Sequence, residues 1–301
     1  MRQSRAWRSL GPQFAVAERL LGATGPARVR AWLDGQVSRP VEREDAAPLG
    51  LLAAVGAGTS DLAPRLINGR RGALVGRVCF SGASSAEAHV EVIAHDLEDF
   101  DHVLDMASTE WQPFAPRSVE LLLAPGEVTT HRASIAALVY AARYDTMSSP
   151  DGQVTLSLFS TDEEPVSIVI ERYRALAAAD PELRRRLQRP SARDICAWRA
   201  KGSLFSVCAR NGTVGLIAVT GGGIGWLEGD VVREEIVAPA HRGRGYAASA
   251  QRAVVGLRRA SNPERPLIGA IEPSNWAARQ SAARAGRQMV LQRVVVPLPL
   301  R

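Results

Sequence analysis

The stretch that decides the fold is V-A-P-A-H-R-G-R-G-Y-A, from Val237 to Ala247. A β-branched run predicts a strand before it, over Val231–Val237, and a helix is predicted after it, over Ala248–Ala260. The first N–H groups of a helix have no partner inside the helix, and glycine lets a backbone approach a ligand closely. This basic, glycine-rich turn is therefore predicted to cradle phosphate oxygens.

The spacing of the turn narrows the class of phosphate ligand. The sequence lacks G-x-x-x-x-G-K-[ST], so a nucleoside triphosphate is not implied. Instead, V-x-P-x-x-R-G-x-G-x-A between a strand and a helix resembles the acyl-CoA binding motif of the GNAT N-acetyltransferase superfamily. The core signature of that family, Q/R-x-x-G-x-G/A, is met by Arg242, Gly245 and Ala247.

A second block, Pro266–Val296, agrees with this resemblance and reads as strand, helix and strand. In the family an Asn follows the fifth strand and a Gly closes the next helix eleven residues later, which is the spacing of Asn275 and Gly286. The resemblance spans Val166–Pro297 in the order of elements. It implies an α/β class with a mixed sheet, and a GNAT fold for a C-terminal domain at 156–301.

The resemblance also implies acetyl-CoA as the acyl donor. Val237 and Ala238 would offer backbone groups to the pantetheine arm, which lies like an added strand. The pyrophosphate would lie on the turn, whose residues are Arg242, Gly243, Arg244, Gly245, Tyr246 and Ala247. Asn275 is a further expected cofactor contact, and no metal is expected.

The implied reaction is acetyl transfer to a primary amine, which must lose a proton before it attacks. Glu234 and Glu235 lie on the predicted strand, and only one of them can face the cleft because strand side chains alternate. We favour Glu235 as the base because it shares the parity of Val237. The alternative is that both are ordinary carboxylates at the rim.

The sequence departs from the family pattern at the expected acid. Many members carry a Tyr seven residues after the Asn, where it reprotonates the thiolate; here that position is Ala282, next to Ser281. Either Ser281 or water serves, or the thiolate, with a pKa near ~8.5, leaves without an acid. A further alternative is that activity is lost.

The first half is predicted to be a second α/β domain, residues 1–155. A helical pattern covers Met1–Ala54, and the segment Ala54–Ala63 reads as a turn rather than a nucleotide loop. The elements predicted next are strands at Ala73–Phe80 and His89–Ala94, a helix at Asp99–Gln112, a strand at Ser118–Ala124, a helix at His131–Tyr144 and a strand at Gln153–Phe159. This order parallels the last third, so we expect a degenerate copy of the same fold; the alternative is an unrelated α/β domain.

The copy would lack a phosphate turn. The segment at that place, His95–Glu98, is acidic and would repel a pyrophosphate. We expect the acidic residues that follow it to begin a solvated helix rather than to hold a metal. The copy would then wall off the substrate cleft and supply specificity, or mediate a homodimer.

The last third carries further predicted elements. They are a strand at Val166–Tyr173, helices at Arg174–Gln188 and Ser191–Ala200, a hairpin with an Asn-Gly turn at Ser203–Thr220, and a glycine-rich connection at Thr220–Trp226.

Composition and charge describe a globular chain with two unlike parts. Of its 301 residues 46% are hydrophobic, and no apolar run approaches the ~20 residues of a membrane span. Residues 1–180 carry 17 Lys and Arg against 23 Asp and Glu, whereas residues 181–301 carry 20 against 8. The basic part is predicted to meet an anion.

The N-terminus and the cysteines predict a cytoplasmic protein. The first residues are basic but lack the apolar core of a secretory signal. Cys79, Cys196 and Cys208 are too widely spaced for a disulfide framework or a metal knuckle, so we expect reduced thiols.

The leading hypothesis is an N-acetyltransferase that acts on an amine-bearing small molecule or peptide. The missing Tyr permits an alternative, a catalytically silent GNAT-like module that binds acyl-CoA. A nucleic-acid-binding protein is a third class. Against it, the basic run Arg184, Arg185, Arg186 and Arg189 is not interleaved with aromatic residues and fits a solvated helix face. No membrane partner is expected.

Overall fold

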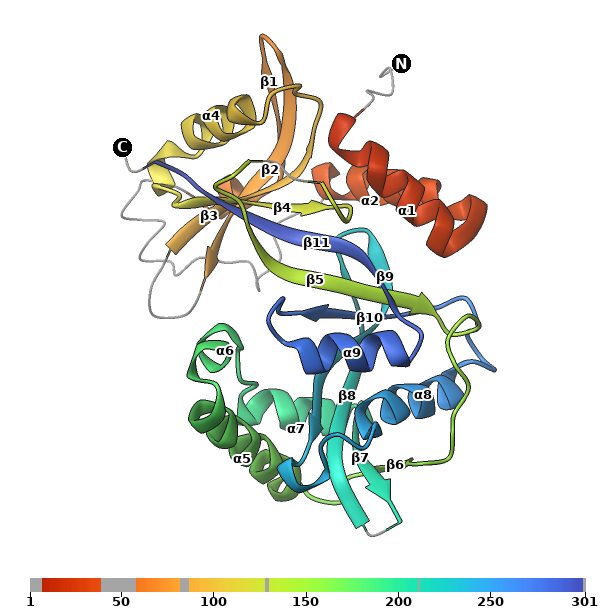
Figure 1. The fold of residues 1–301 in the computed structure, drawn as a ribbon. Coiled ribbons are helices and arrows are strands. Elements are labelled where there is room, and N and C mark those ends of the chain that lie inside the picture. The colour runs from red at the N-terminus through yellow and green to blue at the C-terminus, as the bar shows by residue number, and fades with distance from the viewer. Residues whose placement is uncertain (1–6, 39–57, 82–86, 128–129, 211, 300–301) are drawn as a thin grey trace. The chain divides into compact units, whose positions relative to one another are not determined.

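The computed structural model describes residues 7–38, 58–81, 87–127, 130–210 and 212–299. The chain divides into two compact units (Figure 1). Unit 1 comprises Met1–Ala136 with Leu291–Arg301, and unit 2 comprises Ala137–Val290. The divisions fall inside two strands, β5 (Ser134–Arg143) and β11 (Gln288–Pro297). The domain ranges 1–155 and 156–301 stay a prediction. They differ from the ranges of the units because β5 and β11 each continue from one unit into the other.

Unit 2 is built on a mixed sheet with strand order β5-β10-β9-β8-β7-β6. The strands are β6 (Thr155–Leu158), β7 (Leu204–Ala209), β8 (Gly212–Ile224), β9 (Leu227–Val237) and β10 (Pro266–Ile271). The helices are α5 (Glu163–Ala179), α6 (Pro181–Arg186), α7 (Ala192–Ala200), α8 (Tyr246–Arg258) and α9 (Trp276–Arg284), and a 3-10 helix, η6, spans Pro239–His241. Neighbouring strands are antiparallel except for β9 and β10, which are parallel.

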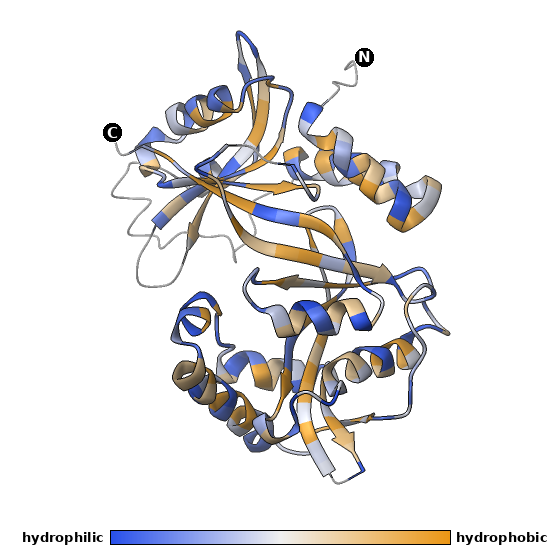
Figure 2. Ribbon diagram, in the orientation of Figure 1, coloured by the Kyte–Doolittle hydropathy of each residue, from blue (hydrophilic) through white to orange (hydrophobic). Residues whose placement is uncertain are grey.

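Apolar side chains on both faces of this sheet hold the helices. Leu216 packs with Val169 of α5 and Ile195 of α7, whereas the next residue, Ile217, packs with Val254 of α8. This is the alternation that a strand buried on both faces requires. Each such side chain contributes about 1.5–3 kcal/mol through burial. Figure 2 shows apolar residues along β7 and the middle of β8.

The parallel pair β9 and β10 stays together only at one end. Leu267 pairs with Asp230 and Ile268 with Val231, and no later pair follows in these described strands. Asp230 anchors the closed end, because it accepts hydrogen bonds from the Tyr144 hydroxyl at 2.7 Å and from Arg265 Nε at 2.9 Å. Beyond this point the two strands separate, which opens a cleft in the sheet.

A β-bulge lies on β9 at the start of the open part. Ala218 of β8 pairs with Glu234, and Val219 pairs with Val232. Arg233 is therefore an extra residue on β9 that has no paired residue on β8. Bulges bend a strand and redirect its side chains. The bulge therefore sets the direction of the two glutamates that follow it.

Unit 1 has a sheet of strand order β1-β2-β3-β4-β11. Its elements are α1 (Gly11–Leu21), α2 (Gly25–Ser38), β1 (Arg65–Gly69), β2 (Gly72–Ser81), β3 (Glu87–His95), α4 (Phe100–Glu110) and β4 (Ser118–Leu123), with 3-10 helices η1 (Arg8–Leu10), η2 (Gly22–Thr24), η4 (Thr59–Leu62) and η5 (Gln112–Phe114). Trp111, at the end of α4, is fully buried in its core. Gly25 permits the close crossing of α1 and α2, since a Cβ there would lie 2.1 Å from the Ala17 carbonyl oxygen.

The two units share one topology. In unit 1, β1, β2 and β3 are successive antiparallel neighbours, α4 follows, and β4 pairs parallel with β3. In unit 2, β7, β8 and β9 are successive antiparallel neighbours, α8 follows, and β10 pairs parallel with β9. This order is what a second copy of the fold in the first half requires.

The helix predicted over His131–Tyr144 is wrong, because this segment contains β5. Every residue from Leu138 to Ala142 is buried, and Leu138–Arg143 pairs with β10. A strand covered on both faces has no alternation, and its alanines and leucine imitate the spacing of a helix.

Two other predictions in the last third are wrong. The strand predicted over Val166–Tyr173 lies within α5, where Val169, Tyr173 and Leu176 are buried at helical spacing and Ile170 is 39% exposed. The β-branched residues suggested a strand, but Glu163 and Glu164 in the first turn favour a helix. The connection predicted over Thr220–Trp226 is instead mostly strand, since β8 continues to Ile224 and its glycines pair with β9.

The helix predicted over Arg174–Gln188 is divided at Asp180 into the end of α5 and the separate helix α6. The other predicted elements agree with the structure within their described parts. Residues 1–6 and 39–54 of the first helical pattern, residues 54–57 of the predicted turn and Asn211 of the hairpin lie outside the described residues. In the described part of the chain, no helix combines the length and the apolarity needed to cross a membrane.

Candidate functional site

The turn between β9 and α8 has the geometry of an anion cradle. Gly243 and Gly245 adopt positive φ values of 77° and 81°, and Gly245 is the N-cap of α8. A side chain at Gly243 would meet nothing within 4 Å, so the turn is open toward the outside. Glycine takes this backbone conformation without strain, which explains why the sequence has glycine at both positions.

The amides of this turn are free. Among the described residues, no acceptor lies within hydrogen-bond distance of the backbone N–H groups from Gly243 to Ala248. The first helical bond runs from the Ser249 N–H to the Gly245 carbonyl oxygen, at 3.1 Å. Unpaired amides at a helix N-terminus attract anions, because their partial charges add to the positive end of the helix dipole.

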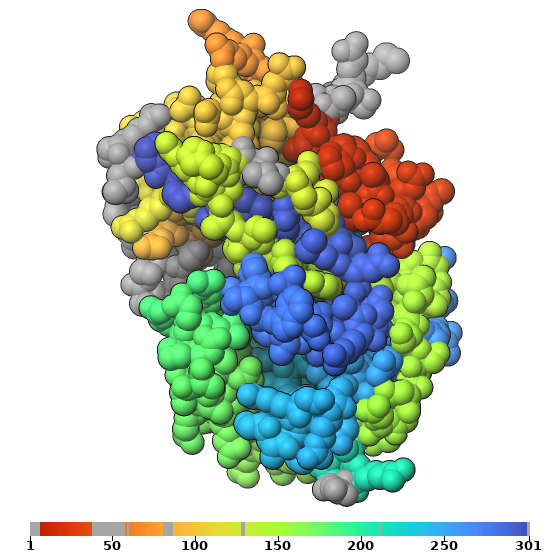
Figure 3. Space-filling model, viewed as in Figure 1, coloured from red at the N-terminus to blue at the C-terminus, as the bar shows by residue number. Residues whose placement is uncertain are grey.

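These amides border a cavity of about 450 Å³, which we call the first cavity. Four of its lining residues are arginines: Arg172, Arg242, Arg244 and Arg284. Figure 3 shows a hollow on this face, between the green segment that holds α5 and the blue segments that hold α8 and α9. The cavity thus combines free amides with an excess of positive charge.

The structure brings almost all the predicted site residues to the first cavity. Those that line it are Glu235, Val237, Arg242, Gly243, Arg244, Gly245, Tyr246, Ala247, Asn275 and Ser281. Ala238 does not line it, because its N–H donates to the Val214 carbonyl oxygen and its own carbonyl oxygen accepts from the His241 N–H, both at 2.9 Å. Glu234 lies at a neighbouring cavity.

That neighbour, which we call the second cavity, has a volume of about 240 Å³ and lies where β9 and β10 separate. Glu234 and Glu235 of β9 line it, together with Gly269 of β10. Glu235 and Asn275 line both cavities, as does Ala278. The two cavities therefore adjoin, with Glu235 at their junction.

The two glutamates face different helices. Glu235 accepts hydrogen bonds from the Gln251 side chain of α8, at 2.9 and 3.0 Å. Glu234 accepts a hydrogen bond from the Tyr173 hydroxyl of α5, at 3.0 Å. The alternation expected from the sequence holds at this pair, yet both carboxyl groups reach the second cavity.

Burial changes the acidity of both carboxyl groups. It raises the pKa of Glu234 and that of Glu235 to about 7, from an ordinary value of 4.5. The hydrogen bond from Tyr173 opposes the shift at Glu234, and the hydrogen bond from Gln251 opposes it at Glu235. A carboxyl group with this pKa is ionised in part at neutral pH and can both accept and release a proton.

Asn275 and Ala282 have structural roles. Asn275 is the N-cap of α9, and its Oδ1 accepts a hydrogen bond from the Ala278 N–H at 3.3 Å. Ala282 is fully buried among Leu138, Tyr140 and Ile271. The position at which the family carries its Tyr thus points into the core here, whereas Ser281 lines the first cavity.

Comparison with known proteins gives a match in structure only. No family model matches the sequence, and no curated protein matches it. A solved acetyltransferase of the GNAT family from Colwellia psychrerythraea is similar in structure, with a TM-score of 0.52 and 12% sequence identity over 91% of this chain and 97% of that one. The protein has a GNAT fold. A GCN5-related N-acetyltransferase from Sphaerobacter thermophilus aligns with a TM-score of 0.49 and 13% identity, over 90% of this chain and 92% of that one.

Within the GNAT fold, sequence reasoning missed four residues of the site. The strand predicted over Val166–Tyr173 includes Arg172 and Tyr173, whereas the helix found there has Tyr173 on its buried side. Gln251 and Arg287 are buried, 0% and 3% exposed, and Arg287 Nε donates to Gln251 Oε1 at 2.9 Å. The available signal was a polar residue, Gln251, inside the apolar stripe of the helix after the turn.

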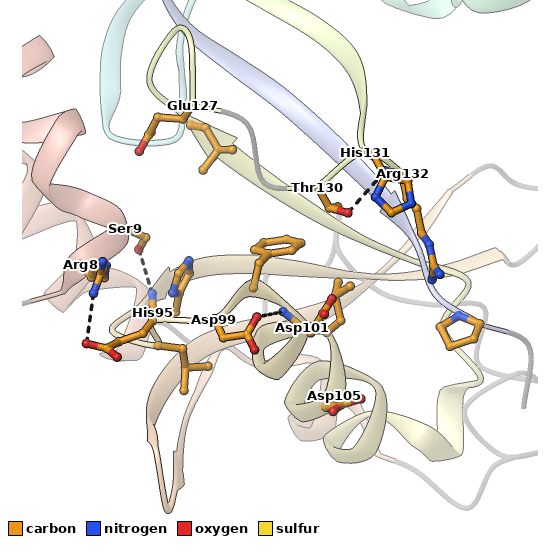
Figure 4. A pocket seen from close by; sticks show the side chains of 16 residues that line it. Arg8, Ser9, His95, Asp99, Asp101, Asp105, Glu127, Thr130, His131 and Arg132 are labelled. Carbon is orange, nitrogen blue, oxygen red and sulfur yellow. Dashed lines mark hydrogen bonds and ion pairs between the residues drawn. The ribbon is translucent and has the colours of Figure 1, made fainter.

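The matching place in unit 1 holds a different cavity, of about 930 Å³ (Figure 4). It lies at the start of α4, where α8 of the GNAT fold carries the cradle. Here Asp99 caps the helix and its own carboxylate accepts from the Asp101 N–H at 2.9 Å. Asp105 and Glu127 also line this cavity. Carboxylates therefore border the start of α4, and Arg8 and Arg132 line the same cavity.

The basic run of α6 is engaged within the protein. Arg185 and Arg186 both pair with Glu182, and Arg186 also pairs with Glu272 at 3.1 Å. Arg184 lies over the ring of Tyr173. Within the described ranges, no three His, Cys, Asp or Glu side chains are grouped so that they could hold a metal ion.

Proposed function

We propose that the protein is an acetyl-CoA-dependent N-acetyltransferase that transfers an acetyl group to a primary amine. The observation that carries this proposal is the junction of the two cavities. One is bordered by free amides and arginines, the other by carboxyl groups with raised pKa values, and Glu235 lies at both. The GNAT fold is consistent with this activity.

The first cavity is the proposed site of the coenzyme. The amides from Gly243 to Ala248 would bind the pyrophosphate oxygens, and Arg242 and Arg244 would add charge-assisted hydrogen bonds. Val237 lines the same cavity, so the pantetheine arm can extend along the edge of β9 that does not pair with β10. This path ends at the second cavity, where the thioester would lie.

The second cavity is the proposed site of the amine. Glu235 would accept a proton from the ammonium group, because its carboxylate lies at the junction where donor and acceptor meet. The neutral nitrogen would then attack the thioester carbonyl carbon, the C–S bond would break, and the sulfur would leave as a thiolate. The nitrogen would release its extra proton to water as the amide forms. Ser281 or water would protonate the thiolate, since Ala282 is buried away from the cavity. Glu234 is the alternative base.

Release of free CoA thiol from acetyl-CoA, measured with a panel of primary amines, tests this proposal. We expect release that depends on the amine and saturates with both substrates. Saturable binding of acetyl-CoA without release of CoA thiol for any amine would contradict the transfer reaction. It would favour a catalytically silent module that binds acyl-CoA, an alternative that the absence of a Tyr at position 282 supports. If the protein did not bind CoA but was retained on immobilised DNA, and if salt abolished that retention, the result would favour a nucleic-acid-binding protein.

A further inference from the structure

Arg287 is a buried cation with an unsatisfied donor. Arg287 is the residue just before β11, it is 3% exposed, and it lines the second cavity. Its Nε donates to Gln251 Oε1 at 2.9 Å, but Nη1 has no hydrogen-bond partner among the described residues, although that atom is itself buried. Buried polar atoms in native proteins nearly always have a partner, so this guanidinium group is a place where a water or a ligand group would complete the hydrogen bonding.

The fold makes room for this guanidinium group. Gly269 of β10 lies beneath it, and a Cβ at this position would come within 2.5 Å of Arg287 Nη1. The unpaired nitrogen therefore lies beside β10, in the region where β9 and β10 have separated. Any larger residue at 269 would push the guanidinium group away.

The protein neutralises this cation only in part. The carboxyl group that interacts electrostatically with Arg287 is that of Glu235, and the Tyr140 hydroxyl group also interacts with it. Both oxygens of Glu235 already accept from Gln251, and its pKa of about 7 leaves it protonated in part at neutral pH. Burial lowers the pKa of Arg287 to about 10, so this side chain stays charged at neutral pH. A buried charge without a full partner is costly, and a ligand with a permanent negative charge relieves that cost.

On the basis of the proposed function, we propose that the acceptor is a small amino acid: a molecule whose carboxylate binds the Arg287 guanidinium group and whose amine lies at Glu234 and Glu235. Groups of both signs line one cavity of about 240 Å³. That volume is below the usual range of ~300–1,000 Å³ for ligand pockets, which favours a small acceptor over a peptide. A thioester oxyanion is a weaker partner for Arg287, because it carries charge only in the transition state.

Matched acceptors test this inference. Each amino acid in a panel, from glycine and β-alanine to the larger L-amino acids, is compared with its own primary carboxamide by the release of CoA thiol. We expect kcat/KM for at least one acid to exceed that of its amide by tenfold or more. Equal values for every acid and amide would overturn the inference while leaving acetyl transfer intact.

Variants assign the preference to this side chain. In Arg287→Met the ratio of acid to amide is expected to fall to about one, with the affinity for CoA unchanged. Arg193→Met, at an exposed position of α7, is the control and keeps the ratio. Gly269→Ala keeps the charge of Arg287 but displaces its Nη1, so this variant should also lower the ratio of acid to amide. It provides the test if Arg287→Met does not fold. A ratio that stays high in both Arg287→Met and Gly269→Ala would contradict the assignment.

Binding separates this inference from the proposed reaction. If no amine is acetylated, calorimetric titration of the CoA-loaded protein with the same acids and amides still gives an answer. Tighter binding of the acid, lost in Arg287→Met, supports the carboxylate site even though the transfer reaction fails. Equal binding of acid and amide, or binding of neither, overturns it.

Discussion

The carboxylate of Glu235 accepts hydrogen bonds at both of its oxygens from the side-chain amide of Gln251, at 2.9 and 3.0 Å. Gln251 lies on α8, the helix whose first amides form the cradle for an anion. One helix thus carries the proposed pyrophosphate site at its N-terminus and fixes the proposed base about one turn further on. Gln251 is a positioning residue in this account, since it acts through Glu235.

Replacing Glu235 by Gln should remove the base while leaving the coenzyme site in place. We expect kcat to fall by about 10²–10⁴-fold, the usual contribution of a positioned base. The affinity for CoA should change little, because the cradle lies at the start of α8. Steady-state kinetics and calorimetry measure the two effects. Full activity in Glu235→Gln would transfer the role to Glu234 or to water, and Glu234→Gln made in parallel distinguishes these.

The raised pKa of Glu235 predicts the pH dependence of the reaction. The ionised form is the base, so kcat/KM should rise with pH through about 7 and then level. This limb should be absent from the residual activity of Glu235→Gln. A profile that is flat between pH 5 and pH 9 in the wild-type protein would contradict a carboxyl base.

The same pKa values predict the direction of a stability change. Glu234 and Glu235 hold protons in the folded state up to a pH of about 7, whereas in the unfolded state they lose them near 4.5. The folded state therefore binds more protons between these values, and the free energy of unfolding should fall as pH rises from 4.5 to 7. Urea unfolding at several pH values measures this. The double variant Glu234→Gln/Glu235→Gln should show a smaller fall over the same interval.

Asn275 should matter to stability as well as to the cavity. Its side chain caps α9, so Asn275→Ala should lower the free energy of unfolding by about 1 kcal/mol. Asn275→Asp keeps an acceptor for the Ala278 N–H and should retain most of this stability. Denaturant titration of both variants checks the prediction. Equal losses in the two would show that the cap is not the cause.

Restoring the family's aromatic residue should not restore an acid. Ala282 is fully buried beside Leu138 and Ile271, so Ala282→Tyr should destabilise the protein by about 1–3 kcal/mol or more through overpacking. Its kcat should not rise. An increase in kcat with unchanged stability would show that position 282 faces the cleft, contrary to the structure.

The turn was predictable because its signals are local. Two glycines, two arginines and a strand-to-helix switch within Val237–Ala260 define the cradle without any distant contact. The topology of unit 1 was predictable in outline, but β5 was not. Its residues are buried on both faces, a condition set by its neighbours rather than by its own pattern.

The chemistry of the second cavity depended on contacts that sequence order does not reveal. Alternation predicted that Glu234 and Glu235 differ in direction, yet the bulge at Arg233 and the separation of β9 from β10 place both at one cavity. Arg287 meets Gln251 across 36 positions of the chain. Such a pair becomes visible only when α8 and the start of β11 are folded together.

The most direct test of the account is the affinity for CoA of a matched pair of variants at the cradle, measured by calorimetry. Gly245 has a φ of 81°, which Asn and Asp both tolerate better than other side chains do. Gly245→Asn should bind CoA within a few-fold of the wild-type protein. Gly245→Asp, which adds only a negative charge at the pyrophosphate, should bind roughly 100-fold more weakly, about 2.7 kcal/mol. Equal affinities in the two variants would contradict binding of the pyrophosphate by residues 242–247.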